Sequence, residues 1–84
     1  MTTVQVRYFA GARAAAGVDE ERLQLPAGVT VSGVLDELTG RHGERLEVVL
    51  RACSLLADGV AVKNRERVLA DGVQLDVLPP FAGG

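Results

Sequence analysis

Thr30-Val31-Ser32-Gly33-Val34-Leu35-Asp36-Glu37-Leu38 has the spacing of an amphipathic helix. The apolar positions recur at i, i+3, i+4 and i+7, which puts one stripe on one face: Val31, Val34, Leu35 and Leu38. Thr30 is a good N-cap, because its hydroxyl can accept a free backbone N–H of the first turn. Gly33 weakens a helix by roughly 1 kcal/mol relative to alanine. We therefore expect one main helix that packs closely on a sheet at Gly33.

The end of this helix is also marked in the sequence. Arg41 and His42 suit the negative end of a helix dipole, and Gly43 is a plausible C-cap. We expect the His42 side chain, at the helix terminus, to lie in solvent. Residues 44–51 carry apolar side chains at helical spacing, which predicts a second, shorter helix.

Strand patterns lie on both sides of the helices. Residues 3–9 alternate, with Val4, Val6 and Tyr8 on one face and Phe9 on the other. Residues 21–25 alternate again, and the stretch between these two strands, residues 11–17, is expected to be a loop with room for one helical turn. Residues 53–57 and 60–62 flank Asp58-Gly59, a strong hairpin signal. Residues 73–78 form the last predicted strand.

The order of elements is therefore strand, strand, helix, short helix, hairpin and strand. One helix stripe facing one sheet predicts an α+β fold of two layers. The order matches the β-grasp, or ubiquitin-like, fold, with a mixed sheet packed on one main helix. In that fold the last strand is central, beside the first, and we expect the tail to leave from a sheet edge. We assign residues 1–78 to the domain and residues 79–84 to a flexible functional tail.

Size and composition exclude several function classes. Eighty-four residues with 48% apolar content predict one small folded domain. A net charge of −2 without a basic run argues against nucleic acid as a partner. The chain lacks the ~20 consecutive apolar residues that span a bilayer, so we do not expect a membrane among its partners. The N-terminal residues do not resemble a signal peptide, and the single cysteine fits a reducing compartment, so the expected location is the cytoplasm.

The tail is the most distinctive candidate for chemistry. Gly83 and Gly84 end the sequence, after the spacer Pro79-Pro80-Phe81-Ala82. An α-carboxylate on such a stalk has no side chain around it, and we expect it to be the reacting group of the protein. The alternative is that Gly-Gly is a frayed end.

Several segments together resemble the small, sulfur-carrying subunit of molybdopterin synthase. The resemblance covers nearly the whole chain and rests on residues 6–10, Ala12-Arg13, Thr30-Val31, residues 69–72 and above all residues 78–84, Leu-Pro-Pro-Phe-Ala-Gly-Gly. It implies that a ubiquitin-activating-like adenylyltransferase adenylates the C-terminal carboxylate with ATP. The acyl-adenylate then becomes a thiocarboxylate, whose sulfur passes to a pterin precursor inside the large synthase subunit. The resemblance further implies a heterotetramer of small and large subunits, with no stably bound cofactor.

The physical properties of the tail suit this cycle. Glycine at positions 83 and 84 leaves a narrow channel unobstructed. Pro79 and Pro80 restrict the stem and so reduce the entropy lost on insertion. Six extended residues reach roughly 20 Å, enough to enter a buried site from a docked domain.

Exposed apolar residues near the tail predict a docking surface. Phe9 and Leu78 lie on the strand faces opposite the core set, and Phe81 could anchor the tail. The expected partner-binding residues are Phe9, Leu78, Pro79, Pro80, Phe81, Ala82 and Gly83. The alternative is that Phe9 and Leu78 close a loosely packed core.

No side chain stands out as catalytic. Cys53 is expected to be a small core residue, and the alternative is a sulfur relay. One histidine and one cysteine do not make a zinc site of the usual ligand number, so no metal is expected. Lys63, Arg65 and Arg67 fit either a solvated loop or a surface for an acidic partner.

We therefore interpret the chain as a sulfur carrier of molybdenum cofactor biosynthesis and not as an enzyme. Gly84 takes the catalytic position only through its carboxylate, and the catalytic side chains are expected on partner proteins. Four alternatives stay open: a carrier for thiamine synthesis, a carrier for cysteine synthesis, a ubiquitin-like protein modifier, and a binding module with an inert tail.

Overall fold

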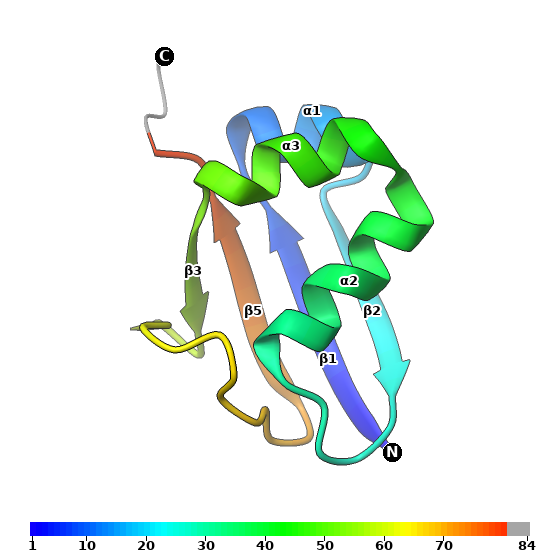
Figure 1. Ribbon diagram of the computed structural model, residues 1–84, viewed down its shortest axis with the longest axis vertical. Helices are drawn as coiled ribbons and strands as arrows, with labels where there is room; N and C mark the ends of the chain where they lie inside the picture. Colours follow the sequence, from blue (N-terminus) through cyan, green and yellow to red (C-terminus); the bar gives the residue numbers. More distant parts are fainter. Residues whose placement is uncertain (81–84) are drawn as a thin grey trace.

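One sheet with helices across one face forms the structure, a computed structural model that describes residues 1–80 (Figure 1). The strands are β1 (Thr2–Tyr8), β2 (Glu20–Leu25), β3 (Ser54–Ala57), β4 (Val60–Ala61) and β5 (Val73–Leu78). The helices of this part of the chain are α1 (Ala10–Ala16), α2 (Val31–His42) and α3 (Glu44–Ala52). These elements confirm the α+β, two-layer prediction.

The sheet has five strands in the order β2-β1-β5-β3-β4. β1 and β5 run parallel, and the other neighbouring pairs are antiparallel, so the sheet is mixed. This is the β-grasp arrangement, with the last strand central and beside the first, as predicted. The expectation that the tail leaves from a sheet edge was wrong in one respect. Because β5 has a neighbour on each side, the chain leaves from the end of the central strand.

The core lies between the sheet and the helices and is almost wholly aliphatic. Strands β1 and β5 supply Val4, Val6, Leu75 and Val77, and none of these side chains is exposed. The predicted stripe of α2 faces them, since its four apolar residues are all buried. Cys53 also belongs to this core. Alternation along β1 and the period of α2 thus identified the buried residues of these two elements correctly.

The ends of α2 are capped as predicted. The Thr30 hydroxyl accepts a hydrogen bond from the Gly33 N–H at 3.1 Å. Gly43, at φ 84°, donates its N–H to the Thr39 carbonyl oxygen at 2.8 Å. The reason given for Gly33 was wrong, because a Cβ there would meet the Val29 side chain at 3.0 Å and not the sheet. The close approach is to the residue that precedes the N-cap.

Helix α1 is the element that the sequence did not predict fully. Residues 11–17 were expected to be a loop with one turn, and the chain instead forms a seven-residue helix. Its alanines favour a helix, and Ala12 anchors it because this side chain is completely buried. Gly17 ends the helix at φ 82°, with its N–H donated to the Arg13 carbonyl oxygen. Gly17 therefore marks a helix C-terminus here, and Gly11 lies inside the first turn of the helix.

The predicted hairpin and charged loop are both present. Asp58 and Gly59 turn β3 into β4 with φ values of 48° and 83°, the positive angles of a tight hairpin turn. The segment that follows also supports α2, since the carbonyl oxygens of Arg67 and Arg65 accept the N–H groups of Val31 and Ser32. Thus the loop satisfies two donors of the first turn that have no partner within the helix.

Candidate functional site

The position where the tail begins is fixed by hydrogen bonds on both sides. In the parallel β1–β5 pair Tyr8 lies opposite Val77, and the Phe9 N–H donates to the Val77 carbonyl oxygen at 3.2 Å. On the other side, Leu78 pairs with Ser54 of β3. The domain therefore presents residue 79 from the middle of the sheet, at the end where α1 and α3 also lie (Figure 1). The predicted reacting residue, Gly84, lies outside the described residues, as do Phe81, Ala82 and Gly83.

The predicted docking residues lie around this exit. Phe9 and Leu78 are the next positions along two adjacent strands, on the face of the sheet that the helices do not cover. Both are half-buried, as is Pro79, whereas Pro80 is exposed. We call Arg7, Phe9, Leu78 and Pro79 the exit surface. Of the predicted partner-binding set, the structure brings Phe9 and Leu78 together at this exit, and Pro79 and Pro80 follow Leu78 in the chain.

A charged pair that the sequence did not predict supports the exit surface. Asp76 points to the open face of β5 but is only 7% exposed, because Arg7 of β1 covers it. The guanidinium donates to both carboxylate oxygens, from Nε at 2.9 Å and from Nη2 at 3.1 Å. These bonds raise the pKa of Arg7, so the residue is a permanent cation. The same guanidinium lies 5.4 Å from the centre of the Phe9 ring, a cation–π contact that orients the ring.

A hollow adjoins the exit surface on the side of β2. Its volume is about 250 Å³, and its lining includes Arg7, Phe9, Arg13 and Glu20. The cavity mixes apolar and charged groups of both signs, which suits a protein surface better than a small apolar ligand. It extends the candidate docking surface beyond the residues that alternation alone identified.

Cys53 lies in the core, which confirms the structural interpretation of this residue. Its side chain is buried, and burial raises the pKa of the thiol, with Arg65 opposing part of that shift. A thiol with a raised pKa is a poor nucleophile near neutral pH. The structure thus gives no support to a sulfur relay through Cys53.

His42 is not in solvent, so that expectation was wrong. Its Nε2 forms a hydrogen bond with Glu21 of β2, whose carboxylate also accepts a 2.6 Å hydrogen bond from the Tyr8 hydroxyl. Arg41 lies 3.8 Å from the other oxygen of Glu21. Glu21 thus joins β1, β2 and the end of α2. Sequence spacing does not show this cluster, since its members are brought together only by the pairing of β1 with β2 and by the end of α2.

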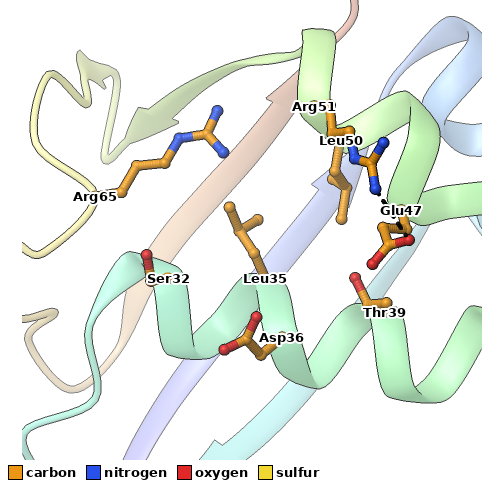
Figure 2. A pocket seen from close by; sticks show the side chains of 8 residues that line it. All are labelled: Ser32, Leu35, Asp36, Thr39, Glu47, Leu50, Arg51 and Arg65. Atoms are coloured by element: carbon orange, nitrogen blue, oxygen red, sulfur yellow. Dashed lines mark hydrogen bonds and ion pairs between the residues drawn. The ribbon is translucent and has the colours of Figure 1, made fainter.

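A second polar groove lies on the helix side, away from the exit surface. It has a volume of about 190 Å³ between α2 and α3, and Ser32, Asp36, Glu47 and Arg51 are among its lining residues. Figure 2 shows Arg65 reaching across one end of it from the loop after β4. Arg65 also donates to the Cys53 carbonyl oxygen at 3.4 Å. Arg65 therefore holds the charged loop against the domain.

The described part of the chain contains no candidate metal site. Among residues 1–80, no three histidine, cysteine, aspartate or glutamate side chains gather closely enough to hold an ion. None of the helices over the same residues has the length and apolar character needed to cross a membrane.

Comparison with known proteins agrees with the geometry. The chain is 30% identical over its whole length to the molybdopterin synthase sulfur carrier subunit of Emericella nidulans, all of which is covered. It is 32% identical to the subunit of the same name from Arabidopsis thaliana, with 96% of this chain and 82% of that protein covered.

Two solved structures have the same fold. A Pyrococcus furiosus protein, whose proposed identity is molybdopterin converting factor, subunit 1, matches with a TM-score of 0.86 at 31% identity. The match covers 96% of this chain and all of that one. The protein SAMP1 of Haloferax volcanii matches with a TM-score of 0.85 at 27% identity, over 98% and 99% of the two chains. The ThiS family model matches residues 6–84, which include the whole exit surface, and the chain therefore belongs to the ThiS family.

Proposed function

We propose that this protein is the sulfur carrier subunit of a molybdopterin synthase, with the carboxylate of Gly84 as the group that carries sulfur. The observation that supports this most directly is the family relationship, together with full-length relatives that bear this name. The fold adds a physical reason. β5 is held on both sides, and the six residues after it would present a carboxylate at a distance from the domain.

The chemistry requires activation, because a carboxylate is a poor electrophile. An adenylyltransferase transfers AMP from ATP to the Gly84 carboxylate and releases pyrophosphate. Hydrosulfide, or a donor equivalent to it, then attacks the acyl carbon. The bond to the phosphate oxygen breaks, AMP leaves with that electron pair, and the product is a thiocarboxylate. Glycine at the last two positions leaves the attacking sulfur unhindered. In this scheme Gly84 contributes the acyl carbon, and partner proteins supply the acid–base groups.

The proposal needs two partner surfaces. The adenylyltransferase and the large synthase subunit each have to enclose the same tail, so each has to approach the end of the sheet where the tail begins. The exit surface offers an aromatic ring, an aliphatic side chain and a fixed cation at this point. Aromatic and arginine side chains are common at the centres of protein interfaces. On these grounds we include a large-subunit partner in the proposal, and we add a heterotetramer because the family resemblance implies it.

The sharpest test changes the end of the tail and nothing else. Deleting Gly84, or adding one residue after it, should abolish sulfur transfer, because the reacting carboxyl is then misplaced. The fold should be retained, since among the described residues 1–80 the buried core lies within residues 4–77. The measurement is pterin conversion with the large subunit, with circular dichroism as the control for folding. Full conversion by the truncated chain would contradict the proposal.

A second variant tests the division of labour. Cys53→Ala should still be adenylated and should still give thiocarboxylate, because the thiol is buried. Pyrophosphate exchange reports adenylation, and intact mass reports the exchange of one oxygen for one sulfur. A folded variant that adenylates normally but gains no sulfur would place Cys53 in the relay.

One other function has a specific observation in its favour. A structure from Methanosarcina acetivorans, 29% identical with a TM-score of 0.82, is described as small archaeal modifier protein 1. A modifier would use the same activated Gly84 and attach it to a lysine. Intact mass of the protein from its native host separates the two. A carrier is found as the free chain with one sulfur, whereas a modifier is found in much larger isopeptide adducts.

A further inference from the structure

An open apolar groove runs between α1 and α3, at the same end of the molecule as the exit surface. Its volume is about 460 Å³. Small residues of α1 form one wall, namely Gly11, Ala14 and Ala15. The other wall belongs to α3, where Val48 and Val49 give the apolar part and Glu44 and Arg45 a charged end. Figure 1 shows these two helices side by side near the point where β5 ends.

The groove exposes apolar surface that the fold itself does not require. Leu46 and Leu50 take the core side of α3, whereas Val48 is 55% exposed. Ala14 is exposed on the opposite wall. The small side chains of α1 leave space beside Val48 that a ring can fill. An aromatic side chain placed there would cover both walls.

The chain beyond residue 80 begins within reach of this groove. The Phe9 N–H donates to the Val77 carbonyl oxygen, so β5 ends beside the first turn of α1. Ala14 lies five residues after Phe9, roughly 8 Å along the helix axis. Phe81 lies three residues after Leu78, a span of roughly 10 Å when extended. The length of the connecting chain therefore permits Phe81 to meet Ala14.

We propose that the groove between α1 and α3 is a docking site for the Phe81 ring of the same chain. Phe81 is the one large apolar side chain of residues 81–84. Docking is intramolecular, and the short connection makes the effective concentration of the ring high. A partner that takes up the tail competes with the groove for Phe81, so its apparent affinity falls by the fraction of tail that is docked. Only this consequence rests on the proposed function.

Nuclear magnetic resonance of the full chain with labelled alanine and valine methyl groups tests the proposal. We expect nuclear Overhauser contacts from the Phe81 ring to the methyl groups of Ala14 and Val48, unchanged on dilution. Phe81→Ala should shift those methyl resonances and leave Val60 and Val68, exposed elsewhere, unmoved. The signal is unambiguous because the other two aromatic rings are engaged elsewhere, Tyr8 against His42 and Phe9 against Arg7.

A matched pair of variants tests the groove itself. Ala14→Leu fills it from the α1 side and should abolish the ring contacts to Val48. Ala27→Leu adds the same side chain to an exposed turn at the opposite end of the molecule and should leave them intact. Absent ring contacts in the wild-type chain, or contacts that survive Ala14→Leu, would overturn the proposal. Contacts that fade on dilution would overturn it too, because the occupant would then be a second copy.

The experiments distinguish a failure of the docking proposal from a failure of the proposed carrier function. The resonance experiment uses the isolated chain without ATP or a partner. Intact mass of the same protein after activation reports whether Gly84 takes up sulfur. A chain that gains sulfur without docking Phe81 would reject the docking site alone.

Discussion

The two faces of the sheet are built from different interactions. On the face that the helices cover, side chains of β1 and β5 such as Val6 and Leu75 are fully buried and wholly aliphatic. On the open face of the same strands, Arg7 and Asp76 form a charged pair and Phe9 stacks below the arginine. Adjacent residues of one strand thus belong to two different environments.

This difference shows how so small a domain can combine folding with recognition. The hydrophobic effect acts through the covered face, where burial of aliphatic area provides most of the free energy of folding. The open face can then carry groups suited to a partner, because the fold does not depend on them to the same degree. The variants below compare the two faces directly.

The largest effect is expected on the covered face. Leu75→Ala should lower the free energy of unfolding by about 3 kcal/mol, since it leaves a cavity under the central strand. Urea denaturation gives this value. The matched control is Gln74→Ala, its half-buried neighbour on the open face, which should change stability by less than about 0.5 kcal/mol. Similar losses for both variants would mean that the two faces contribute alike.

The charged pair of the open face should respond asymmetrically. Asp76 has a side chain that is 9% exposed, whereas that of Arg7 is 40% exposed. Arg7→Leu leaves a nearly buried carboxylate without its cation and should lower the free energy of unfolding more than Asp76→Leu does. Asp76→Leu leaves a cation that can turn to water and should cost about 1 kcal/mol or less.

A double-mutant cycle tests this expectation. Arg7→Leu with Asp76→Leu should be more stable than Arg7→Leu alone, because no unpaired charge is left. Equal losses in the two single variants, with simple additivity in the double, would show that Asp76 is not effectively buried by Arg7.

The contrast between the faces also explains what the sequence could predict. Period-2 alternation follows from burial on one face, so Val4, Val6 and Tyr8 were recognisable as one buried face from the sequence. Thr30, Gly43 and Asp58-Gly59 act on their immediate neighbours, so local rules were enough to assign the caps and the hairpin. The placement of the last strand beside the first came from the whole order of elements, not from any single segment.

Local sequence patterns could not predict the side-chain interactions between strands. The contact between Arg7 and Asp76 joins residues far apart in the chain, and it depends on the register of β1 against β5. The cluster around Glu21 depends in the same way on β1, β2 and the end of α2. Helix α1 was missed for another reason, since Gly11 and Gly17 suggested a loop, whereas the buried Ala12 made a helix favourable. The exit surface was partly predicted, because Phe9 and Leu78 follow from alternation and Arg7 does not.

The stability of the protein should depend on pH through Tyr8. Its ring lies in the core, and its hydroxyl donates a hydrogen bond to Glu21. Burial, and then the hydrogen bond to Glu21, raise the pKa of Tyr8 above its usual value of 10.0. In the unfolded chain Tyr8 loses its proton near that value, whereas the folded chain keeps it. The folded state then binds more protons, so its stability falls as pH rises above about 10.

Tyrosinate absorbance can measure the deprotonation of Tyr8 directly. Tyr8 is the only tyrosine, and the chain has no tryptophan, so tyrosinate absorbance follows this one group. Tyr8→Phe should lose the part of the alkaline decline in stability that comes from the tyrosine. An identical alkaline decline in Tyr8→Phe would assign it to other groups.

The smallest effect on stability, and the one most informative about function, is expected at the exit surface. Leu78→Ser should lower the free energy of unfolding by less than about 1 kcal/mol, because Leu78 is half-buried on the open face. Phe9→Ala should behave similarly. Both should weaken binding to the large synthase subunit, since each removes apolar contact area beside the point where the tail begins. Calorimetric titration gives the affinity, and urea denaturation gives the stability. If Leu78→Ser instead loses as much stability as Leu75→Ala and binds with unchanged affinity, Leu78 belongs to the core, and the open face of β5 has no part in docking.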